Sequence, residues 1–432
     1  MNTFENTINE LFELQRFSIK MGLDNITALC NHLDNPHKKF ASLHVAGTNG
    51  KGATSAIVQR LLSNHGFKCG LYTSPHLIDF RERIRINEEY VGKDFLINCW
   101  ENISKEVNRR QATFFDSTTA IAFEYFSRNN VDLAVIETGL GGRLDSTNIL
   151  HADAAVITPI HYDHMKQLGD NLSSIAAEKA AIIKSGCTVF VSNQEPDVLK
   201  VINKQIRKNN TVYFLSDMIS LQNIRLTRTM SQFDLYDKYR DSTLSELDLN
   251  LAGEFQIQNA ALAYLASRWF IEKKGCKFSY EIFRDTLRTI EWPGRLQCIQ
   301  TEPFVYLDVS HNYSGIRSTL DFLVNQFDKS KLYLLFGMLS DKAFDEIVKI
   351  IYPNFKKIVI TEPLNERKLE GDRLAKEFAR YKINVTIIKD IRSAFEFCLK
   401  KLKSSDTLVV MGSHFLIGPL MTYLHKKHLT SD

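Results

Sequence analysis

The chain has 432 residues, of which 44% are hydrophobic and 24% are charged, with 20 glycines and 9 prolines. Its length predicts two or three domains with a sizeable buried core, and its composition excludes collagen-like and low-complexity proteins. The formal net charge of +4 is too small for this length to indicate a nucleic-acid partner.

The cysteines and the N-terminal segment indicate the cellular compartment in which the protein is expected. Seven cysteines are an odd number and form no C-x-x-C pair, so they indicate neither a disulfide framework nor a cysteine zinc site. The stretch MNTFENTINELFELQRF lacks the apolar core of a signal peptide, and no run of eighteen apolar residues occurs in the sequence. We therefore expect a cytoplasmic protein with neither a membrane nor a nucleic acid as a partner.

In the first part of the chain, apolar β-rich runs alternate with helical patterns. The first run is SLHVAG at 42–47, and it is followed by the loop TNGKG and a helical pattern over 53–66. Later runs are KCGLYTS, DLAVIETG, AAVITPI and TVFVSN, with helical patterns such as LSSIAAEKAAIIK between them. This alternation is typical of a mainly parallel sheet.

Residues 211–251 break this rhythm. The short segments TVYFLS, NIRLTRT, SQFDLYD and SELDLNL predict a small antiparallel β insertion. A long helix is then expected from about Phe255 to Lys273, with Gly275 marking its end.

A second alternating series follows the segment WPGR. Its strands are FVYLDVS, KLYLLFGML, KIVITEP, NVTIIKD and TLVVMGS. A Pro-Gly pair separates the two series, so we place a boundary near Arg295, with domains at 1–295 and 296–432. The predicted fold class is α/β in both domains.

The loop after the first strand has the composition of a phosphate-binding site, because backbone N–H groups at the start of a helix attract anions. It consists of Gly47, Thr48, Asn49, Gly50, Lys51 and Gly52. The loop is shorter than the usual GxxxxGK[ST], and Gly52 and Ala53 stand where a metal-binding hydroxyl is expected. The alternative is a glycine-rich turn that only caps a helix, but the lysine favours phosphate binding.

The residues HVAGTNGKG resemble the ATP-binding loop of the Mur ligase superfamily, in its folylpolyglutamate synthase and dihydrofolate synthase branch. Further family motifs follow in order along nearly the whole chain, namely TSPHL, ERIRIN, ETGLGGRLDSTN, DHMKQLG, IAAEKAAIIK, GEFQIQNA, WPGR, LDVSHN, GMLSDK and VMGS. The resemblance implies an N-terminal P-loop ATPase domain, with a mainly parallel sheet, a small β insertion and the folate or pterin side. It also implies a C-terminal Rossmann-like glutamate-ligase domain.

The resemblance implies ATP and Mg²⁺ as cofactors, with two magnesium ions. Ligation with ATP needs magnesium held by oxygen ligands and phosphates, and the family's ligands match Ser74, Glu137 and His164. Lys179 matches a lysine that is carbamylated in family members and holds the second ion. Without the family, Glu137 is a strand-end carboxylate, His164 a surface or core histidine, and Lys179 an exposed helix lysine.

The family also supplies matches on the nucleotide and amino-acid sides. Asn259 matches the asparagine that hydrogen-bonds adenine, and Arg295 and Asp308 match the residues that meet phosphate and ribose. His311 and Ser413 match residues near the incoming glutamate. The plain alternatives are a linker arginine paired with a carboxylate for Arg295 and turn chemistry after a strand for Asp308 and His311.

The resemblance implies an ATP-dependent ligase that adds L-glutamate to dihydropteroate, to the γ-carboxylate of a folate, or to both, through an acyl phosphate. We expect Lys51, Lys179 and His311 to be catalytic, and the chain to act as a monomer. The family pattern is altered, since Ala53 replaces a serine, EKAAI replaces EKAGI and LDVSHNY replaces DGAHNP. The altered loop leaves open a ligase for another carboxylate or amine, and a non-catalytic ATP-binding module is a further alternative.

Overall fold

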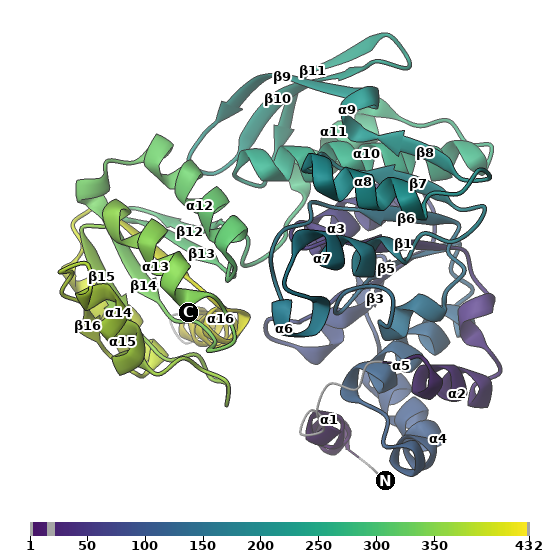
Figure 1. Cartoon of the computed structure of the whole chain (residues 1–432), viewed down its shortest axis with the longest axis horizontal. Helices are drawn as coiled ribbons and strands as arrows, with labels where there is room; N and C mark the ends of the chain where they lie inside the picture. Colours follow the sequence, from purple (N-terminus) through teal and green to yellow (C-terminus); the bar gives the residue numbers. More distant parts are fainter. Residues whose placement is uncertain (1–2, 15–21, 430–432) are drawn as a thin grey trace.

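The computed structural model describes residues 3–14 and 22–429. Two large, mainly parallel sheets dominate it, one in each half of the chain, and a three-stranded sheet lies beside them (Figure 1). The predicted α/β class is therefore confirmed in both halves. No helix in the described ranges is long and apolar enough to cross a membrane.

The N-terminal half is built on an eight-stranded sheet with the order β4-β3-β2-β5-β1-β6-β7-β8. Neighbours from β2 to β8 are parallel, whereas β3 and β4 form an antiparallel edge. The five strands β2, β5, β1, β6 and β7 are fully buried and mostly apolar, as parallel sheets covered on both faces require. The strands are β1 (Ser42–Ala46), β2 (Cys69–Tyr72), β3 (Ile84–Ile86), β4 (Glu89–Tyr90), β5 (Leu133–Glu137), β6 (Ala154–Ile157), β7 (Thr188–Val191) and β8 (Thr211–Phe214).

Helices cover both faces of this sheet. One face packs against α3 (Lys51–Asn64), α10 (Glu254–Lys273) and α11 (Tyr280–Thr289). The long helix predicted from about Phe255 is α10. The opposite face carries α1 (Phe4–Glu13), α2 (Asp24–His32), α4 (Lys93–Arg110), α5 (Phe114–Arg128), α7 (Leu172–Ala180) and α8 (Pro196–Gln205).

The β insertion is smaller than the sequence indicates. Its expected first segment is β8, which pairs in parallel with β7, because α8 supplies the crossover that a parallel neighbour needs. Tyr213 of β8 stacks on Phe190 of β7 with ring centroids 5.3 Å apart. The insertion itself is the antiparallel sheet of β9 (Ile219–Leu226), β10 (Ser231–Asp237) and β11 (Ser242–Leu249), which packs against α10 and α11.

The C-terminal half contains a six-stranded sheet with the order β12-β13-β17-β14-β15-β16, and only β12 pairs antiparallel. Its strands are β12 (Gln297–Thr301), β13 (Phe304–Asp308), β14 (Leu332–Phe336), β15 (Lys357–Ile360), β16 (Thr386–Ile387) and β17 (Thr407–Met411). The sequence did not predict β12, because this exposed edge strand lacks an apolar pattern. The strand expected in NVTIIKD shrinks to the two residues of β16, which are only half-buried.

Two layers of helices enclose the C-terminal sheet. One face carries α12 (Tyr313–Gln326), α13 (Phe344–Ile351) and α14 (Gly371–Ala379), and the other carries α15 (Ile391–Lys401) and α16 (His414–Leu429).

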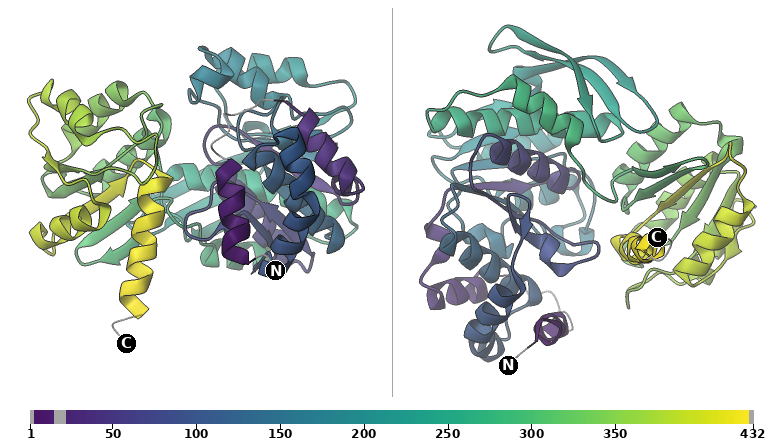
Figure 2. Two further views of the ribbon diagram at one scale, coloured as in Figure 1. Left: turned by 90° about the horizontal axis from the view of Figure 1, so that it is seen from below. Right: turned by 180° about the vertical axis from the view of Figure 1, so that it is seen from behind.

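The two halves touch at several points, and Figure 2 shows the three-stranded sheet reaching across to the C-terminal half. The guanidinium of Arg228, in the turn between β9 and β10, lies over the rings of Phe304 and Phe327 at 5.1 and 4.8 Å. Elsewhere the chain at Leu77 approaches α16 so closely that a Cβ at Gly418 would lie 2.1 Å from the Leu77 carbonyl oxygen. These contacts fix the two sheets with their carboxyl ends facing a common space.

Candidate active site

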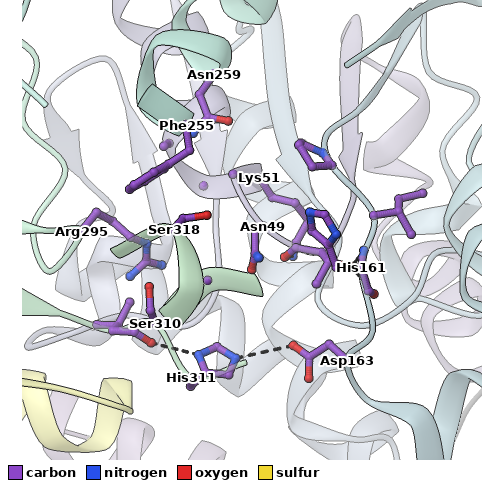
Figure 3. A pocket seen from close by; sticks show the side chains of 18 of the residues that line it. Asn49, Lys51, His161, Asp163, Phe255, Asn259, Arg295, Ser310, His311 and Ser318 are labelled. Atoms are coloured by element: carbon purple, nitrogen blue, oxygen red, sulfur yellow. Dashed lines mark hydrogen bonds and ion pairs between the residues drawn. The ribbon is translucent and has the colours of Figure 1, made fainter. Parts of the chain in front are cut away.

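A cavity of about 780 Å³ opens between the carboxyl ends of the two sheets, which is where ligands bind in open α/β folds. The N-terminal half contributes loops after β1, β5 and β6, and the C-terminal half contributes loops after β13, β14 and β17. Figure 3 labels residues from the loops after β1, β6 and β13. The predicted site residues that line it are Thr48, Asn49, Gly50, Lys51, Gly52, Ser74, Glu137, His164, Lys179, Asn259, Arg295, His311 and Ser413. Of the predicted residues, Gly47 and Asp308 do not line it.

The phosphate loop is packed against the segment that follows β6. The N–H group of Thr48 donates to the Pro159 carbonyl at 2.9 Å. Gly47 has φ of +152°, and a Cβ there would lie 1.9 Å from the hydroxyl oxygen of Thr158, so only glycine fits this position. The N–H groups left for an anion are those of the first turn of α3, which starts at Lys51.

Lys51 and Glu137 lie beside each other next to this turn. The Lys51 ammonium is 3.9 Å from Glu137 Oε1 and donates to the Thr48 carbonyl at 3.2 Å. Glu137 ends β5, is 4% exposed, and accepts the backbone N–H of Ser74 at 3.1 Å. Burial raises the pKa of the Glu137 carboxyl, and Lys51 opposes that rise. The pair therefore offers a cation to a phosphate and a carboxylate to a metal ion at one point.

Lys179 is buried, so the reading of this residue as an exposed helix lysine is wrong. It is 4% exposed, and its ammonium donates to the Gly47 carbonyl at 2.8 Å. Helix α7 is held there by Ile175 and Ala176, which pack in the apolar cluster under β1 and β6. Burial lowers the pKa of Lys179 to about 7, and the nearby Lys51 charge adds to this. A substantial fraction of the amine is therefore neutral near pH 7.

His164 begins the short helix α6 (Met165–Leu168) and lines the cavity. Burial lowers its pKa to about 4, so the imidazole is neutral and keeps a lone pair for a ligand. Ser74 and Glu137 line the same cavity, but the described residues hold no cluster of three His, Cys, Asp or Glu placed for a metal. A magnesium ion here would take further oxygen ligands from bound phosphates, as is usual for nucleotide sites.

Asn259 and Arg295 reach the cavity from different elements. Asn259 lies on α10 with its side chain against Gly50, since a Cβ there would lie 2.4 Å from Asn259 Oδ1. Phe255, one turn earlier, offers an aromatic face beside it, and the sequence analysis did not single it out (Figure 3). Arg295 donates to His414 Nε2 at 3.1 Å. Burial lowers the pKa of Arg295, while Asp308 and Glu137 oppose that effect.

Asp308, which the resemblance matches to a residue that meets ribose, lies behind the cavity wall and does not line the cavity. It is 1% exposed and accepts hydrogen bonds from the Thr319 hydroxyl and from the Ser310 N–H, the latter at 3.1 Å. Val309 and Ser310 line the cavity in its place. The physical reason is that a buried carboxylate needs donors, and here the donors are on α12 and in its own loop.

His311 and Ser413 follow two neighbouring strands of the C-terminal sheet. His311 Nδ1 donates to the Val309 carbonyl at 2.9 Å, and its Nε2 lies 3.7 Å from Asp163 Oδ2 (Figure 3). Ser413 is 3% exposed, and its hydroxyl oxygen accepts the N–H of Phe415 at 3.1 Å. Both side chains thus line the same cavity as the phosphate loop.

Asp163, Lys342 and His414 also line the cavity, and no role was predicted for them from the sequence. Asp163 and Lys342 form an ion pair of 2.6 Å with both side chains 8% exposed. The motifs DHMKQLG and GMLSDK contain these residues. The motifs could therefore have marked both positions as candidates, but nothing in the sequence shows that they are partners.

Comparisons with known proteins agree with this architecture. Residues 45–267 match the model of the Mur ligase middle domain, and residues 294–414 match the Mur ligase glutamate ligase domain. The chain is 32% identical over 417 residues to a dihydrofolate synthase/folylpolyglutamate synthase of Bacillus subtilis, covering 94% of this chain and 95% of that protein. A crystal structure of Mycobacterium tuberculosis folylpolyglutamate synthase with ADP and AMPPCP superposes with a TM-score of 0.88 at 27% identity, covering 97% and 98% of the two chains. Escherichia coli FolC in complex with DHPP and ADP gives a TM-score of 0.87 at 25% identity, covering 99% and 98%.

Proposed function

The chain belongs to the Mur ligase family, and from that premise we propose that it is an ATP-dependent ligase that adds L-glutamate to dihydropteroate, to the γ-carboxylate of a folate, or to both. The observation that supports this proposal most directly is that Lys51 of the phosphate-binding turn lines the same cavity as His311 and Ser413 of the C-terminal half. The names of the relatives support the reaction, and the complexes of relatives with folate and with DHPP support a pterin or folate substrate.

The reaction joins a carboxylate to an amine, and a carboxylate needs activation because its oxygen is a poor leaving group. Attack of the substrate carboxylate on the γ-phosphate of ATP gives an acyl phosphate and ADP. The glutamate amine then attacks the acyl carbon, the amide bond forms, and phosphate and a proton leave. In this scheme Lys51 and Arg295 neutralise phosphate charge, Asn259 orients adenine, and the walls of the cavity exclude water.

Magnesium fits the residues beside Lys51. Glu137 supplies a carboxylate, Ser74 a hydroxyl and His164 a neutral imidazole, and all three line the cavity next to the phosphate turn. When bound, the ion would neutralise phosphate charge and orient the phosphoryl group. Ala53 has no hydroxyl to offer at the position after the loop, so Ser74 would be the hydroxyl ligand.

A second magnesium ion would need an anionic ligand from Lys179. Its neutral amine can add to CO₂, forming an N–C bond and releasing one proton, which turns the side chain into a carbamate. The pKa of about 7 supports this, because the amine of an ordinary lysine with a pKa near 10.4 is neutral about a thousand times less often at pH 7.

We further propose that residues 1–295 form the ATP-binding domain and 296–432 the glutamate-ligase domain, working as a monomer in the cytoplasm. One chain supplies both sides of the cavity, which supports a monomer. All seven cysteines are unpaired, and ATP is the co-substrate, which supports a reducing compartment rich in nucleotide.

A coupled ADP-release assay tests the proposed function. We expect glutamate-dependent ADP release with dihydropteroate, with tetrahydrofolate, or with both, and amide product by mass spectrometry. Omission of glutamate is the control for uncoupled ATP hydrolysis. Release of ADP only with other carboxylates or amines would support the altered LDVSHNY loop as a specificity change, and no release with any acceptor would support a non-catalytic module.

His311 and Asp308 are expected to respond differently to replacement. His311→Ala should lower kcat about 100-fold with little change in melting temperature, because its side chain lines the cavity. Asp308→Ala should lower the melting temperature, since it leaves the Ser310 N–H without its acceptor and removes one of the two acceptors of the Thr319 hydroxyl, at about 1–3 kcal/mol. Steady-state kinetics and thermal unfolding of both variants measure this. Normal turnover in His311→Ala would remove this histidine from the reaction.

A further inference from the structure

One carboxylate of the N-terminal half is bound mainly by the C-terminal half. Asp163 lies in the segment between β6 and α6, and its side chain is 8% exposed. Its Oδ1 accepts from Lys342 Nζ at 2.6 Å, and its Oδ2 accepts from Asn312 Nδ2 at 3.1 Å. His311 Nε2 lies 3.7 Å from the same oxygen (Figure 3). These three partners belong to the C-terminal half.

The partners come from two separate loops of the C-terminal sheet. Asn312 and His311 follow β13, and Lys342 follows β14, while β17 lies between these two strands. Ser413 follows β17 itself. Asp163 therefore contacts the loops after both neighbours of β17, the strand that precedes Ser413, and it does so from the opposite wall of the cavity.

A second chain of contacts connects this point with the phosphate loop. Asn312 Nδ2 also donates to Asn49 Oδ1 at 3.0 Å, so the same amide group faces Asp163 and the loop that precedes Lys51. Asn49 Nδ2 in turn donates to the Ser314 hydroxyl at 2.9 Å. The position of the β13 loop is thus set by two residues of the N-terminal half.

The energetics indicate a role other than stability. A buried ion pair contributes little net stability compared with apolar residues of the same size, because both charges lose their hydration. Moving the halves apart would break the three contacts of Asp163 with the C-terminal half at once and leave only its contacts with the neighbouring His164. The pair is therefore suited to specify one arrangement of the two halves rather than to strengthen the fold.

We propose that Asp163 is a positioning residue that, through Lys342 and Asn312, fixes the β13 and β14 loops over the phosphate loop and so places His311 for the ligation step. This rests on the proposed ligase function. The reacting groups must be aligned within fractions of an ångström, and a displacement of about 1 Å costs about 100-fold in rate.

The test compares Asp163→Asn, Lys342→Met and the double variant. Each single variant is expected to lower kcat about 100-fold, to leave the KM for ATP within about threefold, and to increase the radius of gyration measured by small-angle X-ray scattering. The double variant should be no slower than the worse single variant, because both changes break one contact; independent roles would multiply to about 10,000-fold. Lys342→Arg keeps the charge and should recover part of the lost kcat.

The matched control is Lys273→Met, which breaks the 3.0 Å ion pair with Asp153 within the N-terminal half. It should leave kcat and the radius of gyration unchanged. The proposal is overturned if Asp163→Asn keeps the wild-type kcat, if the losses multiply, or if Lys342→Met alone raises the KM for glutamate. Small-angle scattering and calorimetric binding of AMPPCP do not depend on turnover. If the wild-type chain is inactive, the ligase function is refuted, but these two measurements still test whether the Asp163–Lys342 contact holds the two halves together.

Discussion

Lys51→Ala is expected to abolish ligation, with kcat lowered at least about 1000-fold. Lys51 is the ammonium group of the phosphate loop itself, and its Nζ lies 3.9 Å from the Glu137 carboxylate. In Lys51→Ala, no ammonium group of this loop offsets the negative charge that develops on the transferring phosphoryl group beside the Glu137 carboxylate. The binding of nucleotide should also weaken, because the first turn of α3 keeps its N–H groups but loses its cation.

Steady-state ADP release and calorimetric binding of AMPPCP measure both effects. The matched control is Lys68→Ala, an exposed lysine just before β2 and outside the cavity, which should behave as wild type. Circular dichroism should show that Lys51→Ala is folded, since Lys51 hydrogen-bonds only the carbonyl of its own loop. Near-normal turnover in Lys51→Ala would remove the loop from the mechanism.

Lys179→Ala is expected to cause the second largest loss, because it removes both the amine and the carbamate that it would form. Lys179→Arg should fail equally, since a guanidinium keeps its positive charge and cannot form a carbamate. Acetate or formate is expected to restore part of the activity of Lys179→Ala by placing a carboxylate oxygen in the vacated position. In the wild type, activity after removal of CO₂ should return faster at pH 8 than at pH 6 when the concentration of dissolved CO₂ is the same at both, because a pKa of about 7 makes the amine mostly neutral only at the higher pH.

The measurements are turnover of each variant with and without small carboxylates, and recovery of the wild type after addition of bicarbonate. Lys204→Ala, an exposed lysine on α8, is the control and should not respond to acetate. If Lys179→Arg supports normal turnover, the carbamate and the second magnesium are both refuted. If acetate fails to restore activity but Lys179→Arg is inactive, the vacated space is too small for acetate. Lys179→Glu, which supplies a carboxylate covalently, is then expected to restore part of the activity.

Local patterns were sufficient for most of the fold. Alternation of apolar runs and helical periodicity predicted β1, β2, β5, β6 and β7 in the first sheet and β13, β14, β15 and β17 in the second, because parallel strands are continuous apolar segments. The short edge strands β3 and β4 were not predicted. The same logic misplaced Thr211–Phe214, since a half-exposed strand at the edge of a parallel sheet has the same short pattern as a strand of an antiparallel insertion. Pairing decides between the two, and pairing is not local.

The site was predicted less completely, and the reason is distance along the chain. Asp163 and Lys342 are 179 residues apart and meet only because two sheets face each other. The side-chain direction of Asp308 also depends on Thr319, which lies a full loop and helix turn away. For Lys179, the motif position agreed with the burial that the structure has, whereas the residue type alone favoured an exposed position.

The hydrogen bonds of Asn49 bear on how the binding of one ligand changes the affinity for another. This residue belongs to the phosphate loop but is bonded to Asn312 and Ser314 across the cavity. If nucleotide binds the phosphate loop more tightly in this arrangement of the halves, any ligand that favours the arrangement raises the affinity for nucleotide, and nucleotide raises the affinity for that ligand by the same factor. In that case ATP and a ligand of the C-terminal half would bind with heterotropic cooperativity, although the two ligands need not touch.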